Sequence, residues 1–239
     1  MPQRTISITI LLKIFEMLRL LGPRLFLEKV GYQVFSRIPH LCLGKELDNR
    51  NTASESSQKV ILSPASSEEV RQFFQLMARE SKESRYAMLE RRSFYEKGFD
   101  NCYIGRTIES GEMASITWAV TPGDVKKKRF EHRYPFLKED EMIGENIYTL
   151  EKFRGKGVME STGRQEEAIA AGQGFKRMLF IVREDNVPSL KSCKKRGRLI
   201  YRKLMISHIL FHVKVETIDK YNPPALISIP DETRGHDQY

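Results

Sequence analysis

The spacing of apolar residues between positions 58 and 120 predicts a strand, two helices and a hairpin. Residues 59–62 include three consecutive apolar residues, Val60, Ile61 and Leu62, and predict a short strand. The next segment predicts a helix, with Ser66 or Ser67 as its N-cap, and a buried face at helical spacing formed by Val70, Phe73, Phe74 and Met77. A charged helix is expected next, and two alternating strands that meet at Gly111 then follow, at residues 101–108 and 113–120.

A second series of elements begins near residue 146. Residues 146–150 alternate as a strand and run into a turn with two glycines, after which a helix is expected from Val158. Residues 176–182 include five consecutive apolar residues, a pattern typical of a buried parallel strand. Another short helix should follow, and the last apolar runs, residues 199–204 and 205–215, predict a final hairpin. Strands that alternate with helices in this way predict a mixed α/β domain.

The beginning of the chain is predicted to be an apolar and amphipathic helical extension. Residues 6–21 are very apolar, and their only charges are three residues apart, at Lys13, Glu16 and Arg19. This run is shorter than the roughly 20 apolar residues of a membrane-spanning helix, and no small-residue cleavage site follows it as in a secretory signal. We expect the extension to be retained. Residues 5–38 would then either pack on the domain or on a protein partner, or lie on a membrane surface.

Changes in composition set the expected domain boundaries. A chain of 239 residues with 40% hydrophobic residues is long enough for one domain and an extension. Residues 1–45 are the helical extension and residues 46–57 are a polar linker rich in Ser and Asn. Residues 58–217 are the folded domain, and residues 218–239 are a loosely held C-terminal tail with three prolines.

The turn at residues 154–157 combines two glycines with two cations. Gly155 and Gly157 permit backbone conformations closed to other residues, so main-chain N–H groups can approach a ligand. A helix that begins at Val158 would direct its unpaired amides and the positive end of its dipole to the same place. Arg154 and Lys156 add two positive charges beside it. The pattern predicts a binding site for a pyrophosphate group.

This turn and the sequence after it resemble the GNAT superfamily of acyl-CoA-dependent N-acyltransferases. The family's pyrophosphate loop is Arg/Gln-x-x-Gly-x-Gly/Ala, and this chain has Arg154-x-x-Gly157-x-Met159. A later family signature is an Asn followed by a small residue, a Tyr and a Gly, and the corresponding positions here are Asn186, Ser189, Cys193 and Gly197. The resemblance implies a GNAT-like α/β fold, with a central, mostly antiparallel sheet splayed at the acyl-CoA site.

Three positions depart from the family pattern. Met159 adds bulk in place of the last small residue of the loop, and Arg198 stands where a Phe usually follows the glycine. Cys193 replaces a tyrosine that in many relatives can protonate the departing thiolate. A cysteine can do the same in principle, since its unperturbed pKa is about 8.5, although a small buried thiol is the alternative. These departures favour a second hypothesis, a catalytically degenerate scaffold that binds CoA or a protein.

The resemblance also implies a co-substrate and a set of site residues. Acetyl-CoA, or another acyl-CoA, would be the co-substrate, and no metal is expected. Its pyrophosphate and pantetheine would be bound by Leu150, Arg154, Gly155, Lys156, Gly157, Val158, Met159, Asn186 and Ser189. Cys193 would lie nearest the sulfur, and a backbone amide of the strand before the turn would stabilise the oxyanion.

The reaction also requires a general base, because a protonated amine is not a nucleophile. In this family a glutamate near the start of the strand before the turn is a frequent base, and Glu145 is the best-placed candidate here. Glu141 and His132 are the alternatives, and each of the three has an ordinary interpretation as a surface charge. The predicted reaction is direct attack of the amine on the acyl-CoA in a ternary complex. The acceptor would be a small-molecule or peptide amine.

The net charge of +9 indicates an anionic partner. CoA fits, and a membrane surface or nucleic acid would also fit. The run of cations at residues 126–129 is most simply a solvated loop, with a cover over the acceptor site as the alternative. No recognition motif with interleaved aromatic residues accompanies it, so nucleic acid is the least favoured partner.

The cysteines indicate the cellular compartment. Cys42, Cys102 and Cys193 are far apart and lack the spacing of a CxxC motif or a metal site. They fit a reducing compartment, since disulfides are rare there. The expected location is cytoplasmic, with membrane association of the N-terminal extension left open.

Overall fold

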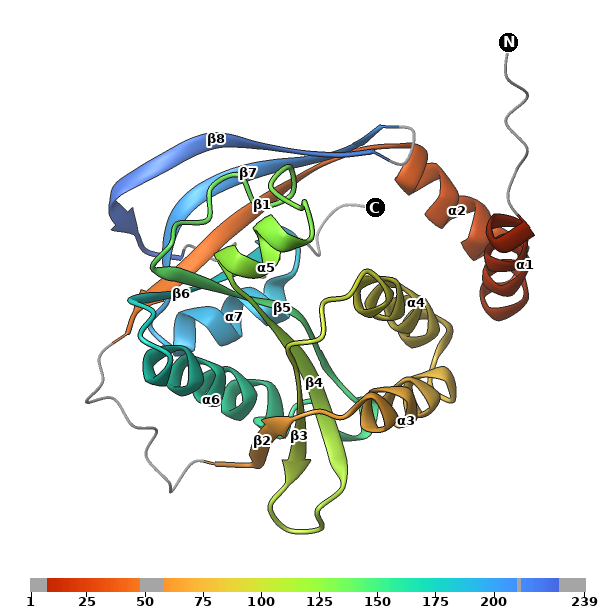
Figure 1. The fold of residues 1–239 in the computed structure, drawn as a ribbon, viewed down its shortest axis with the longest axis horizontal. Coiled ribbons are helices and arrows are strands. Elements are labelled where there is room, and N and C mark those ends of the chain that lie inside the picture. The colour runs from red at the N-terminus through yellow and green to blue at the C-terminus, as the bar shows by residue number, and fades with distance from the viewer. Residues whose placement is uncertain (1–7, 48–57, 210–211, 228–239) are drawn as a thin grey trace, which may run out of the picture.

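The computed structural model describes residues 8–47, 58–209 and 212–227 of the chain. Its strands are β1 (Phe35–Glu46), β2 (Val60–Pro64), β3 (Cys102–Thr107), β4 (Met113–Val120), β5 (Glu141–Thr149), β6 (Arg177–Arg183), β7 (Leu199–Ile209) and β8 (His212–Ala225). They form one sheet in the order β2-β3-β4-β5-β6-β1-β7-β8 (Figure 1). Among these neighbours, β5 and β6 pair in parallel and the other pairs are antiparallel. The predicted mixed α/β fold with a mostly antiparallel sheet is confirmed.

Helices cover both faces of the central strands. They are α1 (Ile8–Leu21), α2 (Pro23–Val34), α3 (Ser67–Ala78), α4 (Lys82–Glu96), α5 (Pro122–Lys127), α6 (Val158–Gly172) and α7 (Val187–Lys195), with a short 3₁₀ turn, η2, at Glu151–Phe153. Helices α3 and α4 lie on one side of strands β3–β5, and α6 and α7 lie on the other side (Figure 1). Helix α1 packs against α4, and α2 reaches the ends of β1 and β7.

The first helix of the domain begins where the sequence predicts. Ser66 is its N-cap and forms a reciprocal capping box with Glu69. The predicted face of α3 is buried at all four positions, Val70, Phe73, Phe74 and Met77. Trp118 on β4 lies in the same core, and its indole N–H donates to the main-chain oxygen of Phe99 at 3.0 Å.

The two helices predicted for the N-terminal extension are present in its described part, but from Phe35 onward the extension is a strand and not a helix. The helices end at Val34, and β1 lies between β6 and β7 in the sheet. Pro39 lacks the N–H group that a helix interior needs. The residues from Leu41 to Gly44 are buried, as expected for an internal strand with both faces covered. The extension therefore completes the sheet of the domain.

The end of the domain also differs from the prediction. The last hairpin consists of β7 and β8, so residues 204 and 205 lie within one strand, whose pairing with β8 shifts register between Lys203 and Leu204. Strand β8 continues to Ala225, beyond the expected boundary at residue 217. Most of the predicted linker, residues 48–57, and the end of the predicted tail, residues 228–239, lie outside the described residues. No helix in the described part of the chain is long and apolar enough to cross a membrane.

Candidate functional site

Strands β5 and β6 are neighbours only at their beginnings. Residues 141–144 pair with residues 177–180, after which β5 continues beside β4 and β6 continues beside β1. The two strands therefore separate toward their carboxyl ends. The wedge between residues 145–149 and residues 181–183 is called the splay below. Ligands of open α/β sheets bind at the carboxyl ends of parallel strands, so the splay is a candidate binding site.

A β-bulge lies where β5 enters the splay. The pairing with β4 shifts so that Asn146 and Ile147 together oppose the single residue Thr117. Asn146 has a φ of 56°, in the left-handed region that Asn tolerates better than most residues. A bulge bends its strand and redirects nearby side chains and main-chain groups. It accounts for the departure of β5 from β6.

Arg91 on α4 binds the main chain of this bulge. Its Nε donates to the oxygen of Asn146 at 2.8 Å, and its Nη2 donates to the oxygen of Ile147 at 2.9 Å. Its Nη1 donates to the oxygen of Ala87 at 2.9 Å, within α4. Burial lowers the pKa of the guanidinium. Arg91 therefore satisfies two carbonyl groups at the splay and connects α4 to β5, a role that the sequence pattern did not reveal.

The turn after β5 has the geometry of an anion site. Gly155 and Gly157 have φ values of 74° and 78°, and a methyl group added at Gly155 would have no heavy atom within 4 Å. Gly157 is the N-cap of α6 and offers no side chain to the first amides of the helix. These amides and the helix dipole favour a bound anion. Residues 154–160 are called the glycine corner below, and the binding of a pyrophosphate there stays a prediction.

The two cations of the glycine corner have different roles. The guanidinium of Arg154 turns back along β5, where it donates to the hydroxyl of Tyr148 at 2.8 Å and to the oxygen of Thr149 at 3.2 Å. Lys156 is exposed, with its Nζ 5.9 Å from the centre of the Phe153 ring. Lys156 is therefore the cation better placed to meet a phosphate, while Arg154 supports the strand that leads to the corner.

An acidic residue in the first turn of α6 is neutralised. Glu160 accepts from Lys195 at 2.7 Å and from Arg164 at 3.0 Å, and these contacts lower the pKa of its carboxyl group. The ion pair with Lys195 also joins the start of α6 to the end of α7. Because Glu160 is paired, its charge opposes a bound anion less than an unpaired carboxylate would.

The remaining predicted residues of the corner contribute through the backbone. Leu150 is buried and its N–H donates to the oxygen of Ala114 at 3.0 Å. Val158 is buried in a small apolar cluster with Val60, and Met159 is half-buried. Their side chains fix the position of the turn, so any contact from Val158 and Met159 to a phosphate would come from main-chain N–H groups.

Asn186 and Ser189 meet at the start of α7. The side-chain oxygen of Asn186 accepts from the N–H of Ser189 at 3.2 Å, which caps the helix. The pair follows β6, while the glycine corner follows β5. Since the two strands are parallel, both parts of the motif lie at the same edge of the sheet. The capping bond gives the three-residue spacing of Asn186 and Ser189 a structural reason, in addition to the functional reason that the sequence predicts.

Cys193 lies in the protein interior. Its side chain is 1% exposed and belongs to a core cluster with Leu41, Leu43 and Leu190 among others. The sulfur accepts from the Nη1 of Arg198 at 3.6 Å and from the Nη2 of Arg196 at 3.9 Å. Two cations therefore lie beside this thiol, and its predicted role near the CoA sulfur stays a prediction.

A buried ionic network lies between α6 and the sheet. Arg198 is 2% exposed, donates to Glu167 at 2.7 and 2.9 Å, and lies 3.1 Å from the centre of the Phe180 ring. Glu166 accepts from the hydroxyl of Thr117, and burial raises its pKa to about 7. These partners explain why α6 carries buried glutamates, Glu166 and Glu167, on a helix that packs against the sheet.

Glu145, the predicted general base, is half-buried on β5 at the start of the splay. Its Oε1 accepts from the hydroxyl of Tyr134 at 3.0 Å. Burial and the nearby Glu145 carboxylate raise the pKa of Tyr134 well above its usual value, so this hydroxyl stays a donor. Arg133 and Arg91 contribute positive charge nearby. Glu145 therefore has a defined orientation next to the bulge.

The two alternative bases lie in different surroundings. Glu141 is fully buried, pairs with Arg177 at 2.5 Å and accepts from the N–H of Lys138 at 3.1 Å. These contacts give it a structural role at the start of β5. His132 is exposed, with its ring next to Phe130. Of the three candidates, Glu145 alone lies in the splay.

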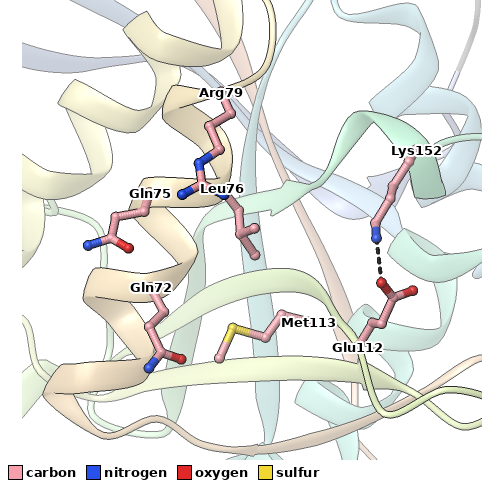
Figure 2. Close-up of a pocket in the computed structure, with 7 residues that line it drawn as sticks. All are labelled: Gln72, Gln75, Leu76, Arg79, Glu112, Met113 and Lys152. Carbon is pink, nitrogen blue, oxygen red and sulfur yellow. Dashed lines mark hydrogen bonds and ion pairs between the residues drawn. The ribbon is translucent and has the colours of Figure 1, made fainter.

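A pocket lies near the turn that follows β5. It has a volume of about 370 Å³, and Figure 2 shows that its walls come from α3, the start of β4 and the turn after β5. Glu112 and Lys152 close one side with an ion pair of 2.7 Å, and the other lining residues are Gln72, Gln75, Leu76, Arg79 and Met113. The pocket includes none of the predicted site residues. Among the described residues, no group of acidic, His or Cys side chains is arranged to hold a metal.

Comparison of the structure with solved proteins identifies the architecture. No protein-family model matches the sequence, and no curated protein matches it. The structure is similar to a GCN5-related glucosamine N-acetyltransferase region of a fungal multi-domain GH3 β-N-acetylglucosaminidase, with a TM-score of 0.55 and 12% identity. That match covers 77% of this chain and 22% of the fungal one.

Two bacterial proteins give weaker matches. A putative GNAT acetyltransferase from Novosphingobium aromaticivorans has a TM-score of 0.48 and 11% identity, over 77% of this chain and 66% of that one. A GCN5-related N-acetyltransferase from Sphaerobacter thermophilus has a TM-score of 0.47 and 9% identity, over 80% and 56% of the two chains. This chain thus spans about a fifth of the length of the fungal enzyme and just over half to two thirds of the bacterial proteins. At these identities the similarity is one of fold.

Proposed function

Because this chain has the GNAT fold, we propose that it is an N-acyltransferase that moves an acetyl or other acyl group from acyl-CoA to an amine. The acceptor would be a small-molecule or peptide amine. One observation carries the proposal: the exposed glycine corner and the splay lie together at the carboxyl ends of β5 and β6. This is the arrangement that an extended thioester carrier requires, with its phosphates at one end and its acyl group at the other.

The glycine corner would bind the pyrophosphate of the acyl-CoA. The first main-chain N–H groups of α6 and the exposed ammonium of Lys156 would contact the phosphate oxygens. Asn186 and Ser189, at the start of α7, would border the pantetheine arm where it enters the splay. Gly155 and Gly157 would allow the close approach, since neither carries a side chain.

The chemical step would take place in the splay. Glu145 would accept a proton from the amine, directly or through a water, and the amine nitrogen would then bond to the thioester carbon. A main-chain N–H of β5 would stabilise the oxyanion that forms. When the carbon–sulfur bond breaks, the CoA thiolate would take a proton from Cys193, which lies beside Arg196 and Arg198, and the proton that the new amide nitrogen loses would return to Cys193.

A thermal-shift measurement with acetyl-CoA, followed by a thiol-release assay with a library of amines, tests this proposal. An increase in melting temperature together with release of CoA in the presence of an amine would support it. Stabilisation without turnover would favour the scaffold described next. The absence of both effects would contradict acyl-CoA binding and therefore both functions.

A catalytically degenerate CoA-binding scaffold is the second candidate, because one specific feature favours it. The thiol of Cys193 is enclosed in the core, which restricts access to a substrate. A scaffold of this kind would bind acyl-CoA at the glycine corner without transferring its acyl group.

A further inference from the structure

Exposed apolar side chains are concentrated at the N-terminal end of the described structure. Of the ten exposed large hydrophobic residues in the described part of the chain, five lie on α1, on α2 or where β1 and β7 meet α2, namely Phe15, Leu18, Leu27, Phe35 and Ile209. Figure 1 shows this end projecting from the body of the domain. Single exposed apolar residues are ordinary, but a group of them marks an interaction site.

Three of these residues form one continuous strip. Leu27 on α2 is 67% exposed, and Gly31 follows one helical turn later with no side chain to cover it. Phe35, at the end of α2, is 78% exposed. Ile209 is 49% exposed and is the direct neighbour of Phe35 across the β1–β7 pair, so the two side chains lie on the same face of the sheet.

Two arginines flank the strip. Arg24 lies three residues before Leu27 on α2, and Arg37 lies two residues after Phe35 on the same face of β1. Both are exposed, and neither forms an ion pair with another described residue. Glu28, next to Leu27 on α2, is paired with Lys29, and Glu216, which also interacts electrostatically with Arg37, is paired with Lys214. The strip is therefore apolar along its length and positively charged at its ends.

We infer that this strip, Arg24–Leu27–Phe35–Arg37 with Ile209, docks the chain on the surface of a membrane that contains anionic lipids. The protruding Leu, Phe and Ile side chains would enter the acyl boundary, and the arginines would meet lipid phosphates. A second copy of the chain is a less suitable occupant. A stable dimer buries about 800 Å² on each partner, and three protruding side chains offer much less.

Vesicle flotation tests this inference with the full chain and two matched double variants. Leu27→Ser with Phe35→Ser removes the strip, while Ile61→Ser with Ile108→Ser removes two exposed residues at the far end of the sheet. Vesicles of phosphatidylcholine alone and of phosphatidylcholine with phosphatidylserine are compared. Circular dichroism and thermal unfolding verify that each variant folds. All four positions are exposed, so the variants should keep the fold.

The expected result is flotation with the phosphatidylserine vesicles that weakens as salt is added. Removal of the strip should reduce flotation roughly tenfold, and the far-end variant should float as the unchanged chain does. A third variant, Arg24→Glu with Arg37→Glu, should abolish the preference for anionic lipid. Equal flotation of the two apolar variants, or no flotation of the unchanged chain, would overturn the inference. A different result in sedimentation without lipid would also overturn it: a dimer of the unchanged chain that is lost only in the strip variant. The strip would then join two copies of the chain.

Discussion

The guanidinium of Arg91 donates a hydrogen bond to the main-chain oxygen of Asn146 at 2.8 Å, at the bulge where β5 leaves β6. A second bond, to Ile147, fixes the adjacent peptide. The residue comes from α4, which belongs to the half of the chain outside the glycine motif. The opening of the candidate site therefore depends on a contact between the two halves of the domain.

Arg91→Lys should destabilise the protein by about 2 kcal/mol, because a partly buried carbonyl left without its charged donor is costly. Lysine keeps the charge, but its single ammonium cannot reach all three carbonyls that the guanidinium binds. Urea unfolding gives the free energy directly. Arg92→Lys is the matched control, since Arg92 makes a partly exposed ion pair with Glu16 and should lose less than about 1 kcal/mol. Equal losses in the two variants would contradict the role given to Arg91.

Gly163→Ala should destabilise the protein by about 2 kcal/mol or more, because overpacking of a buried site is costly. The added methyl group would overlap the Nη1 of Arg196, a residue that is itself buried. Gly172→Ala in the same helix is the control. No heavy atom lies within 4 Å of the methyl group there, so up to about 1 kcal/mol of stability should be gained from helix propensity. Thermal unfolding distinguishes the two variants, and similar melting temperatures would argue against a buried position for Arg196.

Glu166 should make the protein less stable as the pH rises. Burial raises the pKa of its carboxyl group from the usual 4.5 to about 7. A raised pKa means that the folded state holds the proton more tightly than the unfolded chain does. This stabilisation is complete below about pH 4.5 and is lost as the pH rises toward 7. Since one unit of pKa is worth about 1.4 kcal/mol, the loss is at most about 3 kcal/mol.

Glu166→Gln isolates this effect, because glutamine keeps the shape and can still accept from Thr117. The unfolding free energy of the unchanged protein minus that of the variant should fall between about pH 4.5 and pH 7. Glu160 and Asp185 have lowered pKa values, so their contributions change below this window. A difference that is constant across the window would mean that Glu166 is not protonated in the folded state.

Glu145→Gln should lower turnover at saturating substrate while leaving acetyl-CoA binding intact, since general bases typically contribute about 10²–10⁴-fold. Glu139→Gln is the control, because Glu139 is an exposed carboxylate paired with Lys126. The thiol-release rate and the dissociation constant of acetyl-CoA are measured for each variant. Unchanged turnover in Glu145→Gln would remove Glu145 as the base.

Much of the fold followed from local patterns in the sequence. The face of α3 and its capping box could be predicted because helical spacing and a Ser-x-x-Glu start act over short distances. The start of α6 at Val158 followed from the two glycines before it. These features depend on neighbouring residues, which a sequence displays directly.

The features that were missed depend on contacts between distant residues. Strand β1 lies between β6 and β7, and its partners are about 140 and 165 residues away along the chain. Arg91 contacts a bulge 55 residues later. Arg198 pairs with Glu167, which lies 31 residues earlier in the chain. In the sequence, each of these residues looks like an ordinary charged or apolar position. Only the assembled sheet shows which partners they meet.

The central claim is that main-chain donors of the glycine corner and Lys156 bind the diphosphate of an acyl-CoA, and calorimetric titration with acetyl-CoA tests it most directly. The account predicts binding of one acetyl-CoA per chain. Lys156→Glu should weaken this binding roughly tenfold or more, because it places an anion at a phosphate site. Lys220→Glu, at an exposed lysine of β8, should leave it unchanged. The absence of any heat of binding in the unchanged chain, or equal affinities in the two variants, would contradict the account.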